Sequence, residues 1–425
     1  MRVTQTSHFR GRFTLPGDKS LSHRLALMGA LAHGQSRFTN FSTADDCAAT
    51  LRCLEAMGVR THRDGNTVEV VGRGPEGLQA SPAPLDAANS GSTLRMLAGV
   101  VAARPFRSVI TGDESLRRRP VERVAVPLRM MGARAASTDG KPPLVIDGGP
   151  LQGMNWAMTT PSAQVKSAVL LAALQASGRT TVVEPARTRD HTERLLPAFG
   201  VPVQVTGAAV SVEGGARLEP LAYDVPGDVS SAAFLVVAAL VVPDAFVHVE
   251  NVLLNPRRTA FLDVLRRMGA RIETGIRQEH PEPVGWIEAR YSALGSAEIT
   301  ADEVPALIDE VPILAVAAAF ARGDLVVRNA AELRVKESDR IAALAEGLRR
   351  LGATVEEHPD GLTVRGGGAL RGATVRSHGD HRIAMALAIA GLAAEGETEI
   401  EDAGCIAVSF PEFPSLIERG RKAER

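Results

Sequence analysis

Residues that can bind anions or move protons gather where loops lead into helices. The stretch Leu15–Arg24 runs from a Pro-Gly turn into a helix with apolar positions from Leu21 onward, and Lys19, Ser20 and Arg24 lie near its start. Free backbone N–H groups and the positive end of the helix dipole favour an anion at such a place. Two cations and a hydroxyl there are typical of a phosphate or carboxylate site, although a capped helix with solvated charges is the plainer interpretation.

Similar clusters recur along the chain, each before another predicted helix. They are Asn89–Arg95, Arg117–Pro120, Thr160–Lys166, Arg187–His191, Ile308–Glu310, Arg334–Arg340 and His378–Arg382. Each cluster alone has an ordinary explanation as a helix cap, a dipole complement or a solvated charge run. Lys336 and Arg340, however, are four residues apart, and on one helical face such a like-charge pair is unfavourable unless an anion bridges it. Together the clusters predict a site for a ligand that carries several negative charges.

Composition narrows the function classes. The chain has 425 residues, 45% of them hydrophobic, and a formal net charge of −1, which gives a large core but no electrostatic footprint for nucleic acid or an anionic membrane. Three cysteines without CxxC spacing indicate neither a disulfide framework nor structural zinc. His378, Asp380 and His381 do not all face one ion from adjacent positions at a helix start, so we expect no metal. With no signal segment and no membrane span, we expect a cytoplasmic protein.

The chain repeats itself about every 70 residues. A helix rich in Ala, Leu and Val, followed by a Gly or Pro break and a β-prone run, occurs at Leu25–Asn40, Leu94–Gly112, Ser167–Glu184, Ser230–Asn251, Val311–Asn329 and His381–Asp402. These helices are apolar nearly all round, which predicts that they are buried. A second, amphipathic helix follows each and in the first five copies ends at an apolar-apolar-Gly signal, such as Ala56-Met57-Gly58, which is typical of a left-handed C-cap. The paired β-prone runs that follow predict mixed sheets.

Six such units favour two domains of three units each. The segment Val225–Ser231 echoes Leu15–Ser20, because both contain Pro-Gly-Asp before a helix. We therefore predict hinge crossovers at 15–20 and 225–231. Domain I comprises 1–18 plus 227–425, that is, the N-terminal strand and units four to six, and domain II comprises 19–226. A ligand site is expected in the cleft of such a clamshell.

The motifs together resemble one known family. Leu15–Arg24 (LPGDKSLSHR), Asn89–Arg95 (NSGSTLR), Arg119-Pro120, Arg334–Arg340 (RVKESDR) and Gly379–Arg382 (GDHR) resemble, in order along the chain, the 5-enolpyruvylshikimate-3-phosphate synthase family. The resemblance implies an α/β protein with mixed sheets and two domains, each of three βαβαββ units. This is the enolpyruvyl-transferase fold, an inside-out α/β barrel, and it agrees with the repeat count.

The resemblance also implies a transferase reaction. The enolpyruvyl group of phosphoenolpyruvate passes to the 5-hydroxyl of shikimate 3-phosphate through a tetrahedral intermediate, with release of phosphate. The reaction belongs to the shikimate pathway, which leads to chorismate and the aromatic amino acids. The implied partners are the two substrates alone, with no cofactor, no nucleic acid and no membrane, and we expect a monomer.

Site residues carry over from the family motif by motif. The implied ligands of shikimate 3-phosphate are Lys19, Ser20, Arg24, Ser162, Ala163, Gln164, Arg189, Asp309 and Lys336. Those of phosphoenolpyruvate are Lys19, Asn89, Gly91, Arg119, Gln164, Arg340 and Arg382. Some members have a lysine where this chain has Val408, so the phosphoenolpyruvate site is expected to depend more on Arg119, Arg340 and Arg382.

Three residues are implied to be catalytic. Asp309 is the expected base for the 5-hydroxyl and Glu337 the expected acid for the methylene carbon, while Lys19 is the third candidate. The motifs leave open which of the three moves each proton. A carboxyl group that acts as an acid near neutral pH needs a raised pKa, which burial can supply.

Two alternatives differ from this hypothesis in testable ways. The sister enzymes that modify UDP-N-acetylglucosamine typically have a cysteine in the loop where this chain has Arg117–Arg119, and no cysteine lies between Cys53 and Cys405. They also typically have Lys-Asn where this chain has Lys19-Ser20. A non-catalytic, repeat-built anion-binding protein gives no reason for Asp309 and Glu337 to accompany the cations.

Overall fold

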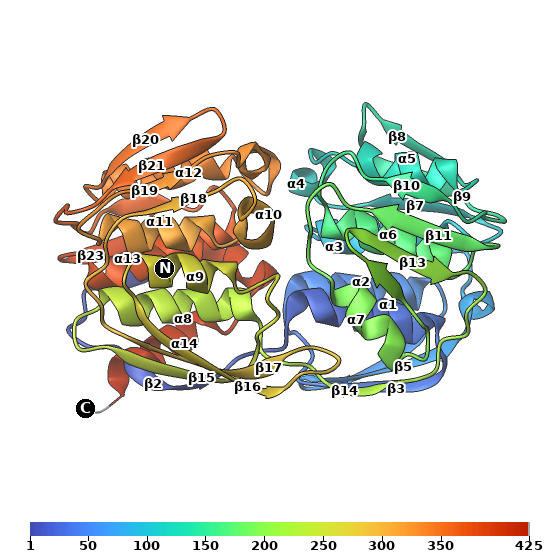
Figure 1. The fold of residues 1–425 in the computed structure, drawn as a ribbon, viewed down its shortest axis with the longest axis horizontal. Helices are drawn as coiled ribbons and strands as arrows, with labels where there is room; N and C mark the ends of the chain where they lie inside the picture. The colour runs from blue at the N-terminus through green and yellow to red at the C-terminus, as the bar shows by residue number, and fades with distance from the viewer. Residues whose placement is uncertain (424–425) are drawn as a thin grey trace. The chain divides into compact units, whose positions relative to one another are not determined.

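The computed structural model describes residues 1–423, and contacts within the chain divide them into two compact units (Figure 1). Unit 1 comprises Met1–Pro16, Pro226–Glu279 and the chain from Pro283 onward. Unit 2 comprises Gly17–Val225 together with His280–Glu282. The chain thus passes from one unit to the other after Pro16 and after Val225, and a short segment near residue 280 is counted with unit 2.

Three buried helices lie in the core of each unit. They are α1 (Lys19–Leu31), α3 (Gly91–Val101) and α6 (Ala163–Ala173) in unit 2, and α8 (Val229–Val241), α11 (Val311–Ala319) and α13 (His381–Ala393) in unit 1. In unit 2, α1 and α6 both pack against α3, and in unit 1 the three helices pack against one another. Every residue of α8 is buried, because its sequence is apolar on all sides. The prediction that the first helix of each unit is buried is confirmed.

The α3–α6 contact requires a glycine. A Cβ on Gly99 would lie 2.0 Å from the carbonyl oxygen of Ala168, so the two helices approach more closely than any larger residue allows. This contact brings the starts of α3 and α6, and the polar residues there, into one region of unit 2.

The amphipathic helices follow the buried ones. They are α2 (Asp45–Ala56), α5 (Glu122–Met130), α7 (His191–Ala198), α9 (Ala260–Arg267), α12 (Arg340–Arg350) and α14 (Phe413–Lys422). A glycine in the left-handed region follows each of the first five, at Gly58, Gly132, Gly200, Gly269 and Gly352. The predicted C-caps are therefore confirmed, and each returns the chain to a sheet. Shorter helical turns are α4 (Glu114–Arg117), α10 (Val304–Leu307), η1 (Pro75–Gly77), η2 (Ala331–Val335) and η3 (Ala403–Val408).

Three mixed sheets belong to unit 2. The first has the order β14 (Ala222–Asp224), β3 (His33–Thr39), β5 (Thr67–Arg73), β4 (Arg60–Asp64). The second has the order β6 (Leu85–Asp86), β7 (Arg107–Thr111), β9 (Lys141–Asp147), β8 (Arg134–Thr138). The third has the order β10 (Asn155–Ala157), β11 (Arg179–Val183), β13 (Ala209–Glu213), β12 (Gln204–Thr206). In each, the first pair is parallel and the other two pairs are antiparallel.

Three further sheets belong to unit 1. The first has the order β2 (Arg10–Thr14), β15 (Phe246–Leu253), β17 (Val284–Arg290), β16 (Arg271–Gln278). The second has the order β18 (Ala297–Ile299), β19 (Leu325–Val327), β21 (Gly361–Arg365), β20 (Thr354–His358). The third has the order β22 (Thr374–Arg376), β23 (Glu397–Glu401), β1 (Arg2–Thr4). The predicted mixed sheets are confirmed in both units.

Two features of the strand pairing depart from a simple six-fold repeat. Strand β2 pairs in parallel with β15, and β14 pairs in parallel with β3, so the strand before each Pro-Gly-Asp turn joins the sheet of the other half of the sequence. The sixth unit does not form the full βαβαββ pattern. Within residues 1–423 no strand follows α14, and β1 from the N-terminus supplies the antiparallel partner of β23 instead.

Across residues 1–423, no helix combines the length and the apolarity that crossing a bilayer requires.

Candidate functional site

Side chains cap five of the helix starts that the sequence singled out, those of α1, α3, α6, α12 and α13. Within residues 1–423, the starts of α5, α7 and α11 have no side-chain cap. Asp18 accepts a hydrogen bond from the backbone N of Leu21 at 2.8 Å, and Asp380 accepts one from the backbone N of Arg382 at 2.9 Å. Ser90, rather than Asn89, caps α3. The plainer interpretation of the clusters as caps therefore holds for these five helices, and it does not account for the neighbouring Lys, Arg and Asn side chains.

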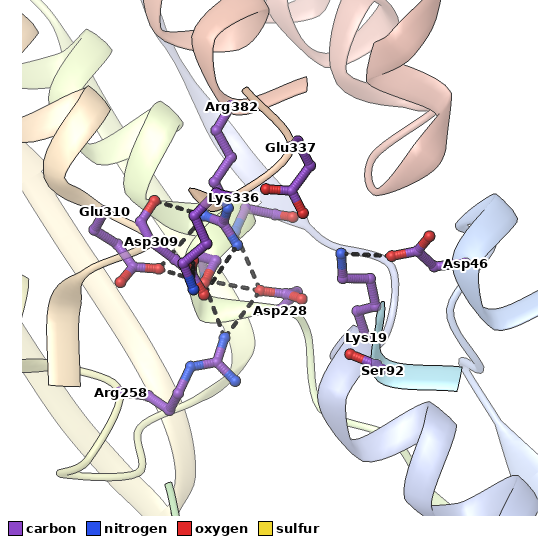
Figure 2. A network of polar contacts seen from close by, with 12 residues as sticks. Lys19, Asp46, Ser92, Asp228, Arg258, Asp309, Glu310, Lys336, Glu337 and Arg382 are labelled. Atoms are coloured by element: carbon purple, nitrogen blue, oxygen red, sulfur yellow. Dashed lines mark hydrogen bonds and ion pairs between the residues drawn. The ribbon is translucent and has the colours of Figure 1, made fainter. Parts of the chain in front are cut away.

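In unit 2, Lys19 lies at the first position of α1 and pairs with a carboxylate. Its Nζ is 3.0 Å from Oδ2 of Asp46, near the start of α2 (Figure 2). His23, one turn further along α1, bonds Thr50 through Nδ1 at 2.7 Å. Burial, helped by the charges of Lys19 and Arg24, holds the pKa of His23 well below its usual value. His23 is therefore a neutral core residue, and Lys19 provides the local positive charge.

Arg24 ties three helices of unit 2 together. Its guanidinium donates to Oγ1 of Thr192 at 2.9 Å, to Oγ of Ser167 at 2.7 Å and to the carbonyl of Ser20 at 2.8 Å. The side chain is buried. These contacts give Arg24 a role in fixing the start of α1, and its predicted contact with shikimate 3-phosphate stays a prediction.

A second group in unit 2 surrounds Gly91 and Gln164. Oε1 of Gln164 accepts from Nη1 of Arg95 at 2.6 Å, and its Nε2 donates to Oγ of Ser92 at 2.8 Å. A Cβ on Gly91 would lie 2.5 Å from Nη1 of Arg95 and 3.6 Å from Nη1 of Arg119. Arg95 was not among the sequence-predicted site residues, although the Asn89–Arg95 motif contains it. Its place one turn into α3 is the signal that could have found it.

Asn89 positions Arg119. Nη2 of Arg119 donates to Oδ1 of Asn89 at 2.6 Å and to Oγ of Ser115 at 3.0 Å, and Nδ2 of Asn89 donates to Asp113 at 2.8 Å. Arg119 is buried whereas Arg117 and Arg118 are exposed. Of the three arginines, Arg117 and Arg118 are therefore exposed to solvent, whereas the side chain of Arg119 is fixed by hydrogen bonds.

The start of α6 and the loop before α7 complete the set in unit 2. Ser162 caps α6, Ala163 is its first residue, and Arg189 lies half-buried just before α7. Behind them the fully buried Lys166 has its Nζ 2.6 Å from Glu193 and 3.0 Å from Glu184. Burial raises the pKa of Glu193 even though the charge of Lys166 opposes this shift.

In unit 1, three cations surround the carboxylate of Asp309 (Figure 2). Oδ1 of Asp309 lies 3.2 Å from Nη1 of Arg340 and 3.8 Å from Nζ of Lys336, and Oδ2 lies 3.9 Å from Nη2 of Arg382. Nη1 of Arg382 also donates to the carbonyl oxygen of Asp309 at 2.9 Å. The predicted base is thus placed among three of the predicted anion ligands.

Arg340 is the most heavily paired of these cations. Its Nε is 2.8 Å from Oδ2 of the fully buried Asp380, and its Nη2 is 2.5 Å from Oε2 of Glu337. Burial acts to lower the pKa of Arg340, but the charges of Asp380, Glu337 and Asp309 outweigh it and raise the pKa. For Lys336 the balance is opposite: burial lowers its pKa, and Asp309 compensates only in part.

The helical spacing argument for Lys336 and Arg340 is wrong. Lys336 follows the turn η2, and Asp339 caps α12 so that the helix begins at Arg340. The two side chains are therefore not on one helical face. They approach because both contact Oδ1 of Asp309, so a carboxylate of the protein itself lies between the like charges.

A further network in unit 1 supports Asp309 and Arg382. Ser230, at the start of α8, donates to Oε1 of the buried Glu310. Nη1 of Arg382 lies 3.6 Å from the same oxygen of Glu310 (Figure 2). Nη2 of the buried Arg258 donates to Oγ of Ser230 at 2.9 Å. Sequence reasoning missed Arg258, which stands in no motif. The only signal for Arg258 was indirect: Asp228, in the polar turn before α8, is one of its partners.

Metal ligands do not assemble in the part of the chain that is described. Among residues 1–423 no group of three His, Cys, Asp or Glu side chains has the geometry to hold an ion. Asp380, which the sequence placed between two histidines, uses its carboxylate for Arg340 and for the start of α13.

Comparison with known proteins shows which family the chain belongs to. The family model described as EPSP synthase (3-phosphoshikimate 1-carboxyvinyltransferase) matches residues 3–417. The chain belongs to the EPSP synthase family. It is 50% identical over 421 residues to the 3-phosphoshikimate 1-carboxyvinyltransferase of Desulforudis audaxviator, an alignment that covers 98% of each chain. Against the protein of the same name from Acidithiobacillus ferrooxidans the identity is also 50%, over 98% of this chain and 96% of that one.

Solved structures give the same result for the fold. The EPSP synthase of Acinetobacter baumannii is similar with a TM-score of 0.87 and 42% identity, covering 98% of this chain and 97% of that chain. The enolpyruvyl-transferase fold implied by the sequence motifs is therefore confirmed, as is the family.

Proposed function

We propose that this chain transfers the enolpyruvyl group of phosphoenolpyruvate to the 5-hydroxyl of shikimate 3-phosphate and releases phosphate. It is a transferase of the shikimate pathway, which supplies chorismate for the aromatic amino acids. Family membership over almost the whole chain supports this reaction. The observation that carries it at the level of residues is Asp309, a carboxylate held within 4 Å of Lys336, Arg340 and Arg382.

The two sets of residues suit the two substrates. The substrates carry several negative charges on phosphate and carboxylate groups. An arginine guanidinium can donate two parallel hydrogen bonds to two oxygens of one such group. We assign Lys19, Ser20, Arg24, Ser162, Ala163, Gln164, Arg189, Asp309 and Lys336 to shikimate 3-phosphate, and Lys19, Asn89, Gly91, Arg119, Gln164, Arg340 and Arg382 to phosphoenolpyruvate. The proposal requires residues of both units to act on one pair of substrates.

The proposed chemistry starts with the 5-hydroxyl. Asp309 accepts its proton while the oxygen attacks C2 of phosphoenolpyruvate, and Glu337 donates a proton to C3, so that the methylene becomes a methyl group. The product of this addition is a tetrahedral ketal phosphate. Glu337, now a carboxylate, then takes a proton from the methyl group, the carbon–carbon double bond re-forms, and the C–O bond to the phosphate breaks so that phosphate departs. Lys19 and Arg340 balance the negative charge on the phosphoenolpyruvate oxygens during both steps.

The pairing of Asp309 explains how substrate binding activates it. Arg340, Lys336 and Arg382 now direct part of their charge to this carboxylate. A substrate phosphate or carboxylate that binds these cations takes over those contacts, and a carboxylate with fewer cationic partners is a stronger base. Anion binding and base activation are therefore one step in this proposal.

Phosphate release tests the proposed reaction directly. Purified chain is incubated with phosphoenolpyruvate and either shikimate 3-phosphate or UDP-N-acetylglucosamine, and free phosphate is measured over time. We expect release with shikimate 3-phosphate only. Release with the second acceptor would assign the chain to the sister reaction, and release with neither would support a non-catalytic anion-binding protein. We further propose a cytoplasmic monomer, and light scattering coupled to gel filtration tests the oligomeric state.

Gly91→Ala is expected to weaken phosphoenolpyruvate binding. The added Cβ lies 2.5 Å from Nη1 of Arg95, so this guanidinium must move and its 2.6 Å bond to Gln164 is disturbed. We expect the KM for phosphoenolpyruvate to rise about tenfold with kcat little changed, because a binding contact is lost. Steady-state kinetics measures both. Gly149→Ala is the matched control, since nothing lies within 4 Å of its Cβ, and an unchanged KM in Gly91→Ala would contradict the assignment.

Affinity for shikimate 3-phosphate is expected to fall as the pH rises through the lowered pKa of Lys336. Burial lowers the pKa of Lys336, so its positive charge is complete below that pKa and is lost as the pH rises through it. The loss therefore begins at a lower pH than for an ordinary lysine. Calorimetric titration between about pH 7 and pH 10 measures the dissociation constant. Lys336→Arg should remove this part of the fall, whereas Lys141→Arg, at an exposed lysine, should not. Identical profiles in wild type and Lys336→Arg would contradict the prediction.

A further inference from the structure

A short segment near residue 280 belongs to a different unit from the two strands beside it in the chain, which the repeat does not explain. Strands β16 and β17 form a hairpin in unit 1, yet its tip, His280–Glu282, is counted with unit 2. The tip carries one acidic residue, Glu282, whose side chain is fully buried. A buried carboxylate at the end of a hairpin is costly unless it is paired, so its partners show what holds the tip.

Glu282 is paired with the start of helix α7. Its Oε1 lies 2.7 Å from Nδ1 of His191, which is also fully buried and is the first residue of α7. Its Oε2 lies 3.9 Å from Nε of Arg194, one turn further along, and the same nitrogen is 3.0 Å from Oδ2 of Asp190. The carboxylate therefore contacts two basic side chains of one helix.

The same carboxylate also influences β14. Burial raises the pKa of Tyr223, and the charge of Glu282 is the next cause, followed by the charges of Asp18 and Asp224. Asp18 and Asp224 stand next to Gly17 and Val225, the residues at which the chain enters and leaves unit 2. The charge of Glu282 therefore acts on Tyr223 in β14, which also belongs to unit 2.

The start of α7 leads directly to the proposed substrate ligands. Thr192, next to His191, accepts a hydrogen bond from Nε of Arg24 and contacts Oγ of Ser167 at 2.7 Å. Arg189 lies two residues before His191 in the same segment. A displacement of the first turn of α7 therefore moves Arg189 and removes a partner of Arg24.

We propose that Glu282 is a positioning residue for shikimate 3-phosphate. Through His191 and Arg194 it holds the first turn of α7, and thereby Arg189 and Arg24, in the arrangement that binds the substrate phosphate. Glu282 itself contacts neither substrate. This inference rests on the proposed function, because it assigns Arg24 and Arg189 to that substrate.

The test compares Glu282→Gln with Glu279→Gln. Glu279 is exposed on the same hairpin and provides a matched change of charge. The dissociation constant of shikimate 3-phosphate is measured by calorimetry without phosphoenolpyruvate, and kcat and the KM for phosphoenolpyruvate are measured at saturating shikimate 3-phosphate. We expect Glu282→Gln to weaken shikimate 3-phosphate binding about tenfold, since small displacements of binding groups have effects of this size or larger. The dissociation constant of Glu279→Gln, and kcat and the KM for phosphoenolpyruvate in both variants, should stay within about twofold of wild type.

Arg194→Gln keeps the proposal testable if Glu282→Gln does not fold. Arg194 is partly exposed and makes the longer contact, so its replacement should be tolerated and weaken shikimate 3-phosphate binding about threefold. A lowered melting temperature with an unchanged dissociation constant would show that Glu282 serves stability alone and would overturn the inference. Failure of the wild-type chain to turn over shikimate 3-phosphate would instead overturn the proposed function, so the two failures are distinguishable.

Discussion

Asp309→Ala is expected to lower kcat by at least about two orders of magnitude, because general-base catalysis of this kind contributes 10²–10⁴-fold. Binding should survive, since the cations around Asp309 remain. Lys336, Arg340 and Arg382 lose a competing carboxylate and stay available to substrate anions. Steady-state kinetics gives kcat, and calorimetry with shikimate 3-phosphate alone gives the dissociation constant, which we expect within about threefold of wild type.

Asp302→Ala is the control for this change. Asp302 is exposed and lies one helical segment before Asp309 in the chain, so it removes the same charge without touching the cation cluster. Its kinetics should match wild type. An Asp309→Ala enzyme that keeps its kcat but loses affinity would show that Asp309 serves binding alone and does not accept the proton.

Arg340→Met is expected to destabilise unit 1 as well as to abolish turnover. Arg340 is 2% exposed and pairs with the carboxylates of Asp380, Glu337 and Asp309. Removing one partner of such a buried network leaves uncompensated charge, which costs about 3–5 kcal/mol in the free energy of unfolding. Urea denaturation followed by circular dichroism measures this loss.

The control for Arg340→Met lies on the same helix. Arg350 is half-exposed, and its Nη2 is 3.2 Å from Oε1 of Glu346. Arg350→Met should change the free energy of unfolding by less than about 1 kcal/mol, because exposed ion pairs contribute little. Equal losses in the two variants would mean that the carboxylates around Arg340 do not depend on its charge for their burial.

The local pattern of the fold was predictable because it depends on short-range chemistry. An all-round apolar helix such as α8 must be buried wherever it packs, and a glycine such as Gly58 ends a helix because it adopts a left-handed conformation. The order of buried helix, strand and amphipathic helix therefore followed from the sequence of each unit. The repeated Pro-Gly-Asp turn predicted that the N-terminal strand belongs to domain I, but it did not predict which strands β2 and β14 pair with, because those partners lie more than 180 residues away.

The composition of the candidate site was predictable to the extent that motifs carry it. Asp309, Lys336, Arg340 and Arg382, which the family resemblance singled out, lie together in unit 1, and their roles toward the substrates stay predictions. Their approach does not come from helical spacing, because a cap at Asp339 starts the helix only at Arg340. The charged residues of a motif therefore indicate what kind of ligand they can bind, but their spacing does not predict how the side chains are arranged.

Residues outside the motifs were not predictable. Arg258 supports Glu310 through Ser230, and Glu282 supports His191 from a distant hairpin. Each is one charged residue in an unremarkable stretch, and its partner lies far away in sequence. Hinge motion about 15–20 and 225–231, and the substrate role of each ligand, stay predictions that binding and kinetics must test.

The mass of the product formed in D₂O tests the central claim most directly. Addition followed by elimination converts the methylene of phosphoenolpyruvate into a methyl group that contains one solvent-derived hydrogen. Loss of one of its three hydrogens then leaves deuterium in the enolpyruvyl group of part of the product. Mass spectrometry should therefore show this label in 5-enolpyruvylshikimate 3-phosphate, and Glu337→Gln should slow its appearance. An unlabelled enolpyruvyl product, or a phosphorylated shikimate 3-phosphate with free pyruvate, would contradict the account.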